Sequence, residues 1–242
     1  MYRYATDRQD HGDLAGGKVL RSAPGMPGFP VRLADEVFQR AAALHGADRP
    51  PVVWDPCCGS GHLLTALGLL HPDRIAAVLA GDIDEAALSL ARRNLALLTA
   101  DGLRERRDEL AGLHRAHGKD SHREAVAAAD RLAARVRGIG SAVRRADVFD
   151  PAELRPAVAG HRPDLVITDV PYGELTRWRG APAEPVAALV RSVAAVLAED
   201  AVIAVSCRAR RVPLGGLPAV GSLKVGHRAV AFLRAGQVRR QT

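Results

Sequence analysis

The fold of this chain is decided by residues 52–64, which read VVWDPCCGSGHLL. Three apolar residues lead into Asp55 and a glycine-rich turn, and the apolar run 62–70 follows the turn. This order is typical of a buried parallel strand that passes into its covering helix. A second strand-like run lies at 75–80. Together the segments predict a βαβ unit with a ligand crevice at the carboxyl end of the first strand.

Strands and helices are expected to alternate through the rest of the chain. Further strand-like runs lie at 142–148, 165–170 and 202–207, followed by 223–225 and 229–233, which we expect to be antiparallel. Apolar residues at helical spacing predict helices at 31–44, 85–98 and 185–197. The chain is therefore predicted to be an α/β protein with a Rossmann-like, mostly parallel seven-stranded sheet flanked by helices.

A length of 242 residues fits a single domain with additions. Residues 1–30 are rich in Gly, Pro and polar residues, so we expect an N-terminal extension whose first residues are mobile. Residues 101–140 interrupt the alternation, because they are rich in Ala, Arg and Glu and contain neither proline nor a strand-like run. We interpret this segment as an inserted helical pair.

The formal net charge of +7 favours polyanionic partners such as RNA. Residues 201–242 contain eight Arg or Lys and no acidic residue, and we expect Arg208, Arg210 and Arg211 to contact phosphates. No apolar run approaches the roughly 18 residues that a membrane helix needs, so a cytoplasmic protein without membrane contact is expected. Three cysteines, two of them adjacent, predict neither a disulfide framework nor a metal site.

The glycine-rich turn is expected to hold a nucleoside without phosphates. Gly59 and Gly61 let the backbone approach a ligand, but no Lys-Ser/Thr pair follows and Leu64 stands where a dinucleotide motif has its third glycine. Asp82 can accept both ribose hydroxyls, and Asp147, at the end of the third predicted strand, can contact the adenine amine. These features point to S-adenosyl-L-methionine. The alternative is a tight turn beside a solvated Asp82, with Asp147 as a turn-forming residue.

A candidate catalytic loop, DVPYG at 169–173, follows the fourth strand and is expected to face the same crevice. The carboxylate of Asp169 can accept hydrogens from a base nitrogen as that nitrogen attacks a methyl group. Pro171 fixes the loop, and the ring of Tyr172 offers a face on which an extruded base stacks. The loop therefore predicts methylation of a base nitrogen.

These motifs resemble those of class I methyltransferases with an Asp/Asn-Pro-Pro-Tyr loop, and more narrowly those of the AviRa family of 23S ribosomal RNA methyltransferases. The similarity runs from about residue 19 to 233 and is carried by Pro24 and by GFPVRLA at 28–34, WDPCCGSG at 54–61, NLALL at 94–98, ADVFDP at 146–151 and DVPYGE at 169–174. The resemblance implies methylation of guanine at ring nitrogen 1 and resistance to orthosomycin antibiotics such as avilamycin.

The resemblance also implies a set of functional residues. It places the cofactor against Arg32, Asp55, Cys57, Gly59, Gly61, Asp82, Ile83, Asp147 and Val148. It implies 23S rRNA or a ribosomal subunit as the partner. The few aromatic residues offer no obvious interface, so a monomer is expected. Val170 replaces the first proline of the wider loop pattern. Since a ring N–H must lose its proton, Asp169 is expected to act as a base rather than only as an acceptor.

Other functions stay open at this point. The enzyme alternatives are methylation of an exocyclic amine on another RNA base or tRNA, of duplex DNA, or of a small molecule. A DNA enzyme normally needs a separate recognition module, for which no segment is large enough. A small-molecule enzyme usually has an apolar lid, which the charged 101–140 segment does not resemble. A catalytically silent RNA-binding protein that protects against antibiotics is a further alternative.

Overall fold

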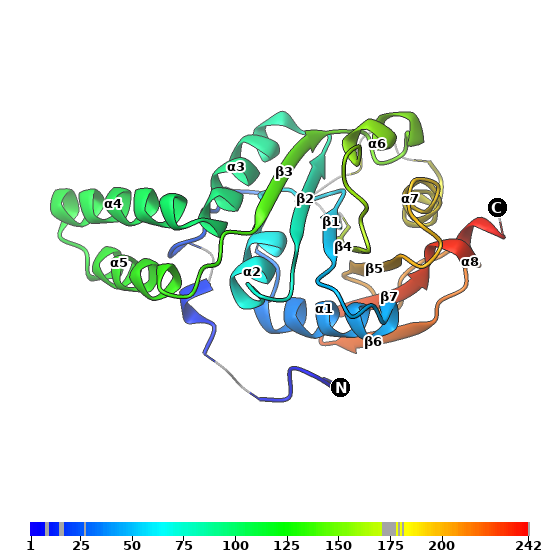
Figure 1. Cartoon of the computed structure of the whole chain (residues 1–242), viewed down its shortest axis with the longest axis horizontal. Coiled ribbons are helices and arrows are strands. Elements are labelled where there is room, and N and C mark those ends of the chain that lie inside the picture. The colour runs from blue at the N-terminus through cyan, green and yellow to red at the C-terminus, as the bar shows by residue number, and fades with distance from the viewer. Residues whose placement is uncertain are drawn as a thin grey trace.

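The computed structural model describes residues 1–7, 10–14, 17–26, 28–170, 178, 180 and 182–241. Within these residues, seven strands form one sheet in the order β3-β2-β1-β4-β5-β7-β6 (Figure 1). The strands are β1 (Val52–Asp55), β2 (Ala77–Asp82), β3 (Gly140–Arg145), β4 (Leu165–Asp169), β5 (Val202–Cys207), β6 (Gly221–Val225) and β7 (Arg228–Arg234). The first five strands are parallel and β7 is antiparallel to both neighbours, so the sheet is mixed but mostly parallel.

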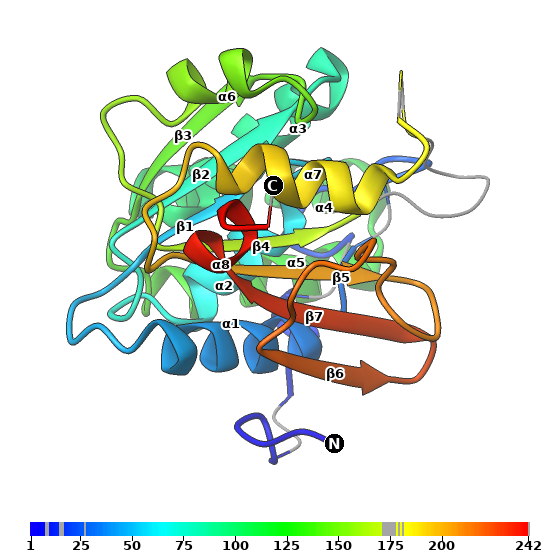
Figure 2. The ribbon, with the colours of Figure 1, turned by 90° about the vertical axis from the view of Figure 1, so that its right-hand side faces the viewer.

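Helices cover both faces of the sheet because successive strand residues point into two different cores. In β4, Leu165 and Ile167 belong to one core and Val166 to the other. Figure 2 shows the sheet between α1 and α7. The helices are α1 (Val31–His45), α2 (His62–Leu70), α3 (Glu85–Leu95), α4 (Ala100–His117), α5 (Asp120–Ala133), α6 (Pro151–Ala157), α7 (Pro185–Ala194) and α8 (Ala235–Arg239). No helix in the described ranges is long and apolar enough to cross a membrane.

Between α3 and β3 the chain forms a 3-10 turn and two packed helices. Thr99 caps α4 by accepting a hydrogen bond from the Gly102 amide, and Gly118 ends the helix in a left-handed conformation with φ of 63°. Leu103 and Leu110 of α4 are buried with small residues of α5. The two helices extend beyond the β3 edge of the sheet (Figure 1). They occupy most of the 101–140 segment.

The predicted third strand at 142–148 was placed too late in the chain. The strand is Gly140–Arg145, and residues 147 and 148 lie in the turn that follows it. This strand is at the sheet edge and largely exposed, so apolar residues do not mark its limits. The next helix, α6, was not predicted, although its sequence contains the cap: the side chain of Asp150 accepts the Ala152 amide, and proline begins the helix.

The first residues of the chain pack on the domain, in contrast to the expected mobile terminus. The fully buried carboxylate of Glu36, on α1, accepts hydrogen bonds from the backbone amides of Arg3, Tyr4 and Ala5 at 2.6 to 2.8 Å. A buried carboxylate needs such donors, and it obtains them here from the terminus. Composition alone does not show this interaction.

Residues 17–26 are held equally firmly by side chains from later in the chain. The amide side chain of Asn94 accepts a hydrogen bond from the Arg21 backbone N–H and donates one to its carbonyl, at 2.8 and 2.9 Å. The guanidinium of Arg106 donates to the Val19 carbonyl at 2.9 Å. The N-terminal segment is therefore bound to α1, α3 and α4.

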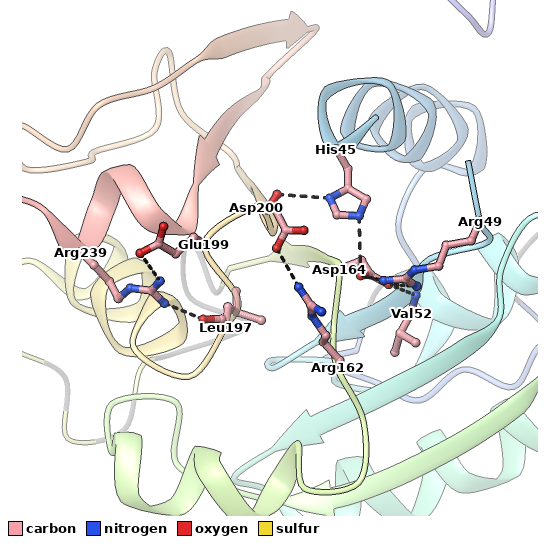
Figure 3. Close-up of polar contacts among 9 residues, drawn as sticks. All are labelled: His45, Arg49, Val52, Arg162, Asp164, Leu197, Glu199, Asp200 and Arg239. Atoms are coloured by element: carbon pink, nitrogen blue, oxygen red, sulfur yellow. Dashed lines mark hydrogen bonds and ion pairs between the residues drawn. The ribbon is translucent and has the colours of Figure 1, made fainter. Parts of the chain in front are cut away.

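A cluster of polar side chains stabilises the end of the sheet where β1 and β4 begin (Figure 3). Asp164 is 2% exposed and accepts hydrogen bonds from Nη1 and Nη2 of Arg49, at 2.9 and 2.5 Å, and from the Val52 amide at 2.8 Å. The ring Nε2 of His45 lies 3.6 Å from Asp164, and its Nδ1 lies 3.2 Å from the Asp200 carbonyl. The Asp164 cluster thus joins the end of α1 to two strands.

Candidate active site

Three carboxylates mark the carboxyl ends of neighbouring strands. Asp55, Asp82 and Asp169 are the last residues of β1, β2 and β4, which pair in parallel. Burial raises the pKa of Asp55 to about 7, and the negative charges of the other two carboxylates act in the same direction. Burial also raises the pKa values of Asp82 and Asp169. The predicted crevice therefore contains the acidic groups that the sequence indicates.

The turn after β1 requires glycine at two positions. Gly59 and Gly61 have φ values of 51° and 72°, in the left-handed region that side chains disfavour. At Gly61 a Cβ atom would also lie 3.1 Å from the backbone of Ala91 on α3, so the turn packs closely there. At Gly59 a Cβ atom would meet nothing within 4 Å. Open space over a glycine backbone at a strand end is what a close-lying ligand needs.

Asp82 joins the end of β2 to this turn. Its Oδ2 accepts a hydrogen bond from the Gly59 amide at 2.9 Å, and its Oδ1 accepts one from the Asp84 amide at 3.0 Å. Since each carboxylate oxygen can accept two hydrogen bonds, the group can also bind ribose hydroxyls. The ribose contact of Asp82 stays a prediction, whereas its role in fixing the turn is not evident from the sequence. The following residue, Ile83, is half-buried.

Asp147 and Val148 lie between β3 and α6. The Oδ1 of Asp147 accepts a hydrogen bond from the Phe149 amide at 2.9 Å, as in a turn-forming Asp, and its own amide donates to Glu153 at 2.8 Å. Val148 is buried in the core beneath α6 and α7. The structure therefore supports the turn-forming role, and contact of Asp147 with adenine stays a prediction.

The two cysteines of the turn are not reactive groups. Cys57 is half-buried, and its amide donates to the Asp55 carboxylate at 3.1 Å. Burial, reinforced by the charges of Asp55 and Asp82, raises the pKa of both the Cys57 and Cys58 thiols well above the ordinary value. These side chains stay protonated at neutral pH and act as small packing groups.

Arg32 binds the N-terminal segment. Its Nε and Nη2 donate to the Ala5 carbonyl at 2.9 and 2.8 Å, Nη2 also donates to the Thr6 carbonyl, and its guanidinium lies 4.3 Å from the centre of the Tyr2 ring. It also lines a cavity of about 580 Å³ with His62 at the start of α2. Contact between Arg32 and the cofactor stays a prediction.

Asp169 forms an ion pair that the sequence did not reveal. Its Oδ1 lies 2.5 Å from Nη1 of Arg228, the first residue of β7. The positive charges of Arg228 and Arg208 and the Ser206 hydroxyl oppose the effect of burial on the Asp169 pKa. The only signal for Arg228 is a basic residue directly before the apolar run 229–233. Pro171 and Tyr172 lie outside the described residues.

The predicted RNA-binding arginines are exposed beside this site. Arg208, Arg210 and Arg211 follow β5, whose residue Ser206 pairs with Asp169 in the sheet. The influence of Arg208 on the Asp169 pKa shows that this segment lies near the candidate base. The arrangement combines a glycine turn, a largely buried carboxylate and exposed positive charge at the carboxyl end of the parallel strands.

Comparison with known proteins agrees with this architecture. The chain is 51% identical, over 98% of its length and 97% of the relative's, to a Streptomyces viridochromogenes protein named 23S rRNA (guanine(2535)-N(1))-methyltransferase. Two crystal structures of the rRNA methyltransferase aviRa from that organism, at 1.5 and 2.4 Å, each match with a TM-score of 0.93 and 50% identity, covering 99% of this chain and 98% of theirs. The family described as rRNA methyltransferase AviRa matches residues 1–228. This chain therefore belongs to the AviRa family of rRNA methyltransferases.

Proposed function

We propose that this protein transfers the methyl group of S-adenosyl-L-methionine to N1 of a guanine in 23S rRNA. The observation that carries the proposal is the placement of the Asp169 carboxylate at the end of β4, beside the glycine turn and Asp82 at the ends of β1 and β2. The name of the relative supports the base and the nitrogen. We further propose that the protein acts as a monomer in the cytoplasm and protects ribosomes from orthosomycin antibiotics, with α4 and α5 as an insertion in the fold.

The residues present fit the cofactor. The open backbone at Gly59 can lie against it, and the Asp82 carboxylate can accept hydrogen bonds from its ribose. When bound, the cofactor supplies an electrophilic methyl group on a positively charged sulfur. The Asp82 carboxylate, which lies at the end of β2 beside the glycine turn, can also attract such a cation through its negative charge.

Asp169 can remove the proton from N1 of the target guanine. Guanine N1 carries a hydrogen, so its lone pair becomes available only when that proton is removed. The largely buried Asp169 carboxylate has a raised pKa, which makes it a stronger proton acceptor than an exposed aspartate. The Tyr172 ring is proposed to stack on the guanine after the guanine has been extruded from the RNA helix.

The test is methyl transfer from labelled S-adenosyl-L-methionine, followed by mass spectrometry of the nucleosides. Naked 23S rRNA, assembled large subunits, tRNA, DNA and small amines are compared as substrates. We expect 1-methylguanosine in 23S rRNA. An exocyclic N-methyl or a 2′-O-methyl product would contradict the proposal, and RNA binding without transfer would indicate a silent protective protein.

Asp82→Ala is expected to weaken S-adenosyl-L-methionine binding by about 1.5 to 3 kcal/mol, because the ribose loses a charged acceptor and Gly59 loses its anchor. Calorimetry measures the dissociation constant. Asp84→Ala is the control: it removes the cap on the Ala86 amide, so stability should fall by about 0.5 to 2 kcal/mol with little change in binding. An unchanged dissociation constant in folded Asp82→Ala protein would refute the assignment.

Replacing Arg208, Arg210 and Arg211 together with glutamine is expected to weaken RNA binding and to flatten its salt dependence. Each lost phosphate contact should reduce the slope of log affinity against log salt by about 0.7 to 0.9. Binding is measured by filter retention between low and physiological salt. A second triple variant, with glutamine at the exposed residues Arg104, Arg115 and Arg123, removes the same charge from α4 and α5. Equal slopes of log affinity against log salt for the two variants would show that the loss of RNA binding depends only on net charge and not on the position of the arginines.

A further inference from the structure

The guanidinium of Arg228 is buried at the edge of the candidate active site. Arg228 begins β7, and the next residue, Ala229, pairs with Cys207 at the end of β5. The neighbouring residue of β5, Ser206, pairs with Asp169. The antiparallel strand thus brings a residue from late in the chain to the carboxyl end of the parallel strands. Only 7% of the Arg228 surface is exposed.

Contacts with Asp169 and Phe29, among the residues that the structure describes, help to fix this guanidinium. Nη1 lies 2.5 Å from Oδ1 of Asp169, and the central carbon lies 4.9 Å from the centre of the Phe29 ring. Phe29 is buried just before α1, so Arg228 lies between the N-terminal part of the domain and the end of β4. Burial of a guanidinium is unfavourable unless it is paired, and an arginine keeps its charge at any working pH. Asp169 therefore lies beside a permanent positive charge in a fixed position.

We propose that Arg228 is a positioning residue that binds Oδ1 of Asp169, keeps this carboxylate ionised and directs Oδ2 toward the N1 proton of the target guanine. The inference rests on the proposed function. In the step, the N1–H bond breaks and the proton goes to Asp169. The bond from N1 to the methyl carbon forms as the carbon–sulfur bond breaks, and that electron pair stays on sulfur. A protonated Asp169 cannot accept the proton.

The charges around Asp169 explain why an arginine is needed. The negative charge of Asp169 acts unfavourably on Asp55 at the end of the neighbouring strand β1, and burial favours the protonated form of Asp169. Arg228 on β7 and Arg208 after β5 oppose this, and so does the Ser206 hydroxyl. Arg208 is exposed to solvent, which screens its charge, whereas Arg228 is buried in direct contact. Arg228 therefore contributes most to keeping Asp169 ionised.

The test is the pH profile of single-turnover methyl transfer by Arg228→Gln protein at saturating RNA and cofactor. Removal of a contacting opposite charge shifts a carboxyl pKa by about 1 to 3 units. We expect the acid limb of the profile to move to higher pH by that amount, so activity on the acid limb should be about 10- to 1,000-fold lower than that of the wild type at the same pH and should recover as the pH rises. Arg228→Lys keeps the charge, so its acid limb should stay near that of the wild type while its rate falls from lost geometry.

Arg234→Gln is the matched control, because Arg234 lies on the same strand but donates to the Leu44 carbonyl away from the site. It should lower stability without moving the acid limb. A rate loss in Arg228→Gln that is uniform across pH would overturn the inference. If Arg228→Gln protein does not fold, Arg228→Lys decides the question. An acid limb that lies about 1 pH unit or more above that of the wild type in Arg228→Lys would overturn the inference. Wild-type protein that makes no 1-methylguanosine refutes the proposed function instead, so the two failures are distinguishable.

Discussion

Asp169→Asn protein is expected to transfer methyl groups about 100- to 10,000-fold more slowly than the wild type in single turnover, while binding the cofactor with nearly unchanged affinity. The amide keeps the shape of the side chain and can still accept a hydrogen bond from Arg228, but it cannot take up a proton at neutral pH. The loss should therefore appear in the chemical step. Rapid quenching followed by mass spectrometry of the nucleosides measures it.

Asp48→Asn is the control for this variant. Asp48 is an exposed aspartate in the loop between α1 and β1, and its substitution should leave the rate unchanged. A wild-type rate for Asp169→Asn would show that guanine N1 loses its proton to another group. Slow transfer together with a large loss of cofactor affinity would instead place Asp169 in cofactor binding.

Asp164→Ala is expected to lower the free energy of unfolding by about 2 to 4 kcal/mol. The substitution leaves the half-buried Val52 amide without its acceptor, breaks both contacts with Arg49 and removes the carboxylate beside His45 (Figure 3). The Arg49 side chain is 53% exposed, so water still solvates its charge after the substitution. Urea unfolding measures the change.

Asp200→Ala provides the comparison for this measurement. The ion pair between Arg162 and Asp200 spans 3.3 Å, but its side chains are 67% and 56% exposed, so its loss should cost less than about 1 kcal/mol. Equal losses of unfolding free energy in Asp164→Ala and Asp200→Ala protein would show that burial does not make the Asp164 contacts more stabilising. Folded Asp164→Ala protein should transfer methyl groups normally, because Asp164 lies directly before β4 whereas Asp169 ends it.

The sequence predicted those elements whose limits are set by burial. The runs at 52–54 and 202–207 match β1 and β5 closely because these strands are buried in the middle of the sheet. The edge strand β3 has a mostly exposed surface, and its apolar residues extend past its hydrogen-bonded part. Periodicity of apolar residues is therefore a good guide to central strands and a poor one to edges.

The residues of the candidate site also differ in how far the sequence predicts them. Gly59, Gly61 and Asp82 belong to one βαβ unit, so their juxtaposition follows from local order along the chain. Arg228 and Asp169 are 59 residues apart, and their contact depends on the placement of an antiparallel strand. No local pattern encodes such a pair. The buried Glu36 was missed for the same reason, because its partners are amides of a distant segment.

The binding of the N-terminal segment has a consequence for how the protein is made. Residues 17–26 leave the ribosome early, yet Asn94 is 73 residues after Arg21, and Arg106 is 87 residues after Val19. These contacts cannot form until α3 and α4 have been synthesised. The segment must therefore dock late, onto a core that has already begun to assemble, and contacts of such wide sequence separation slow folding. Until then, the apolar side chains of Val19 and Leu20 have no core to enter and are available to chaperones.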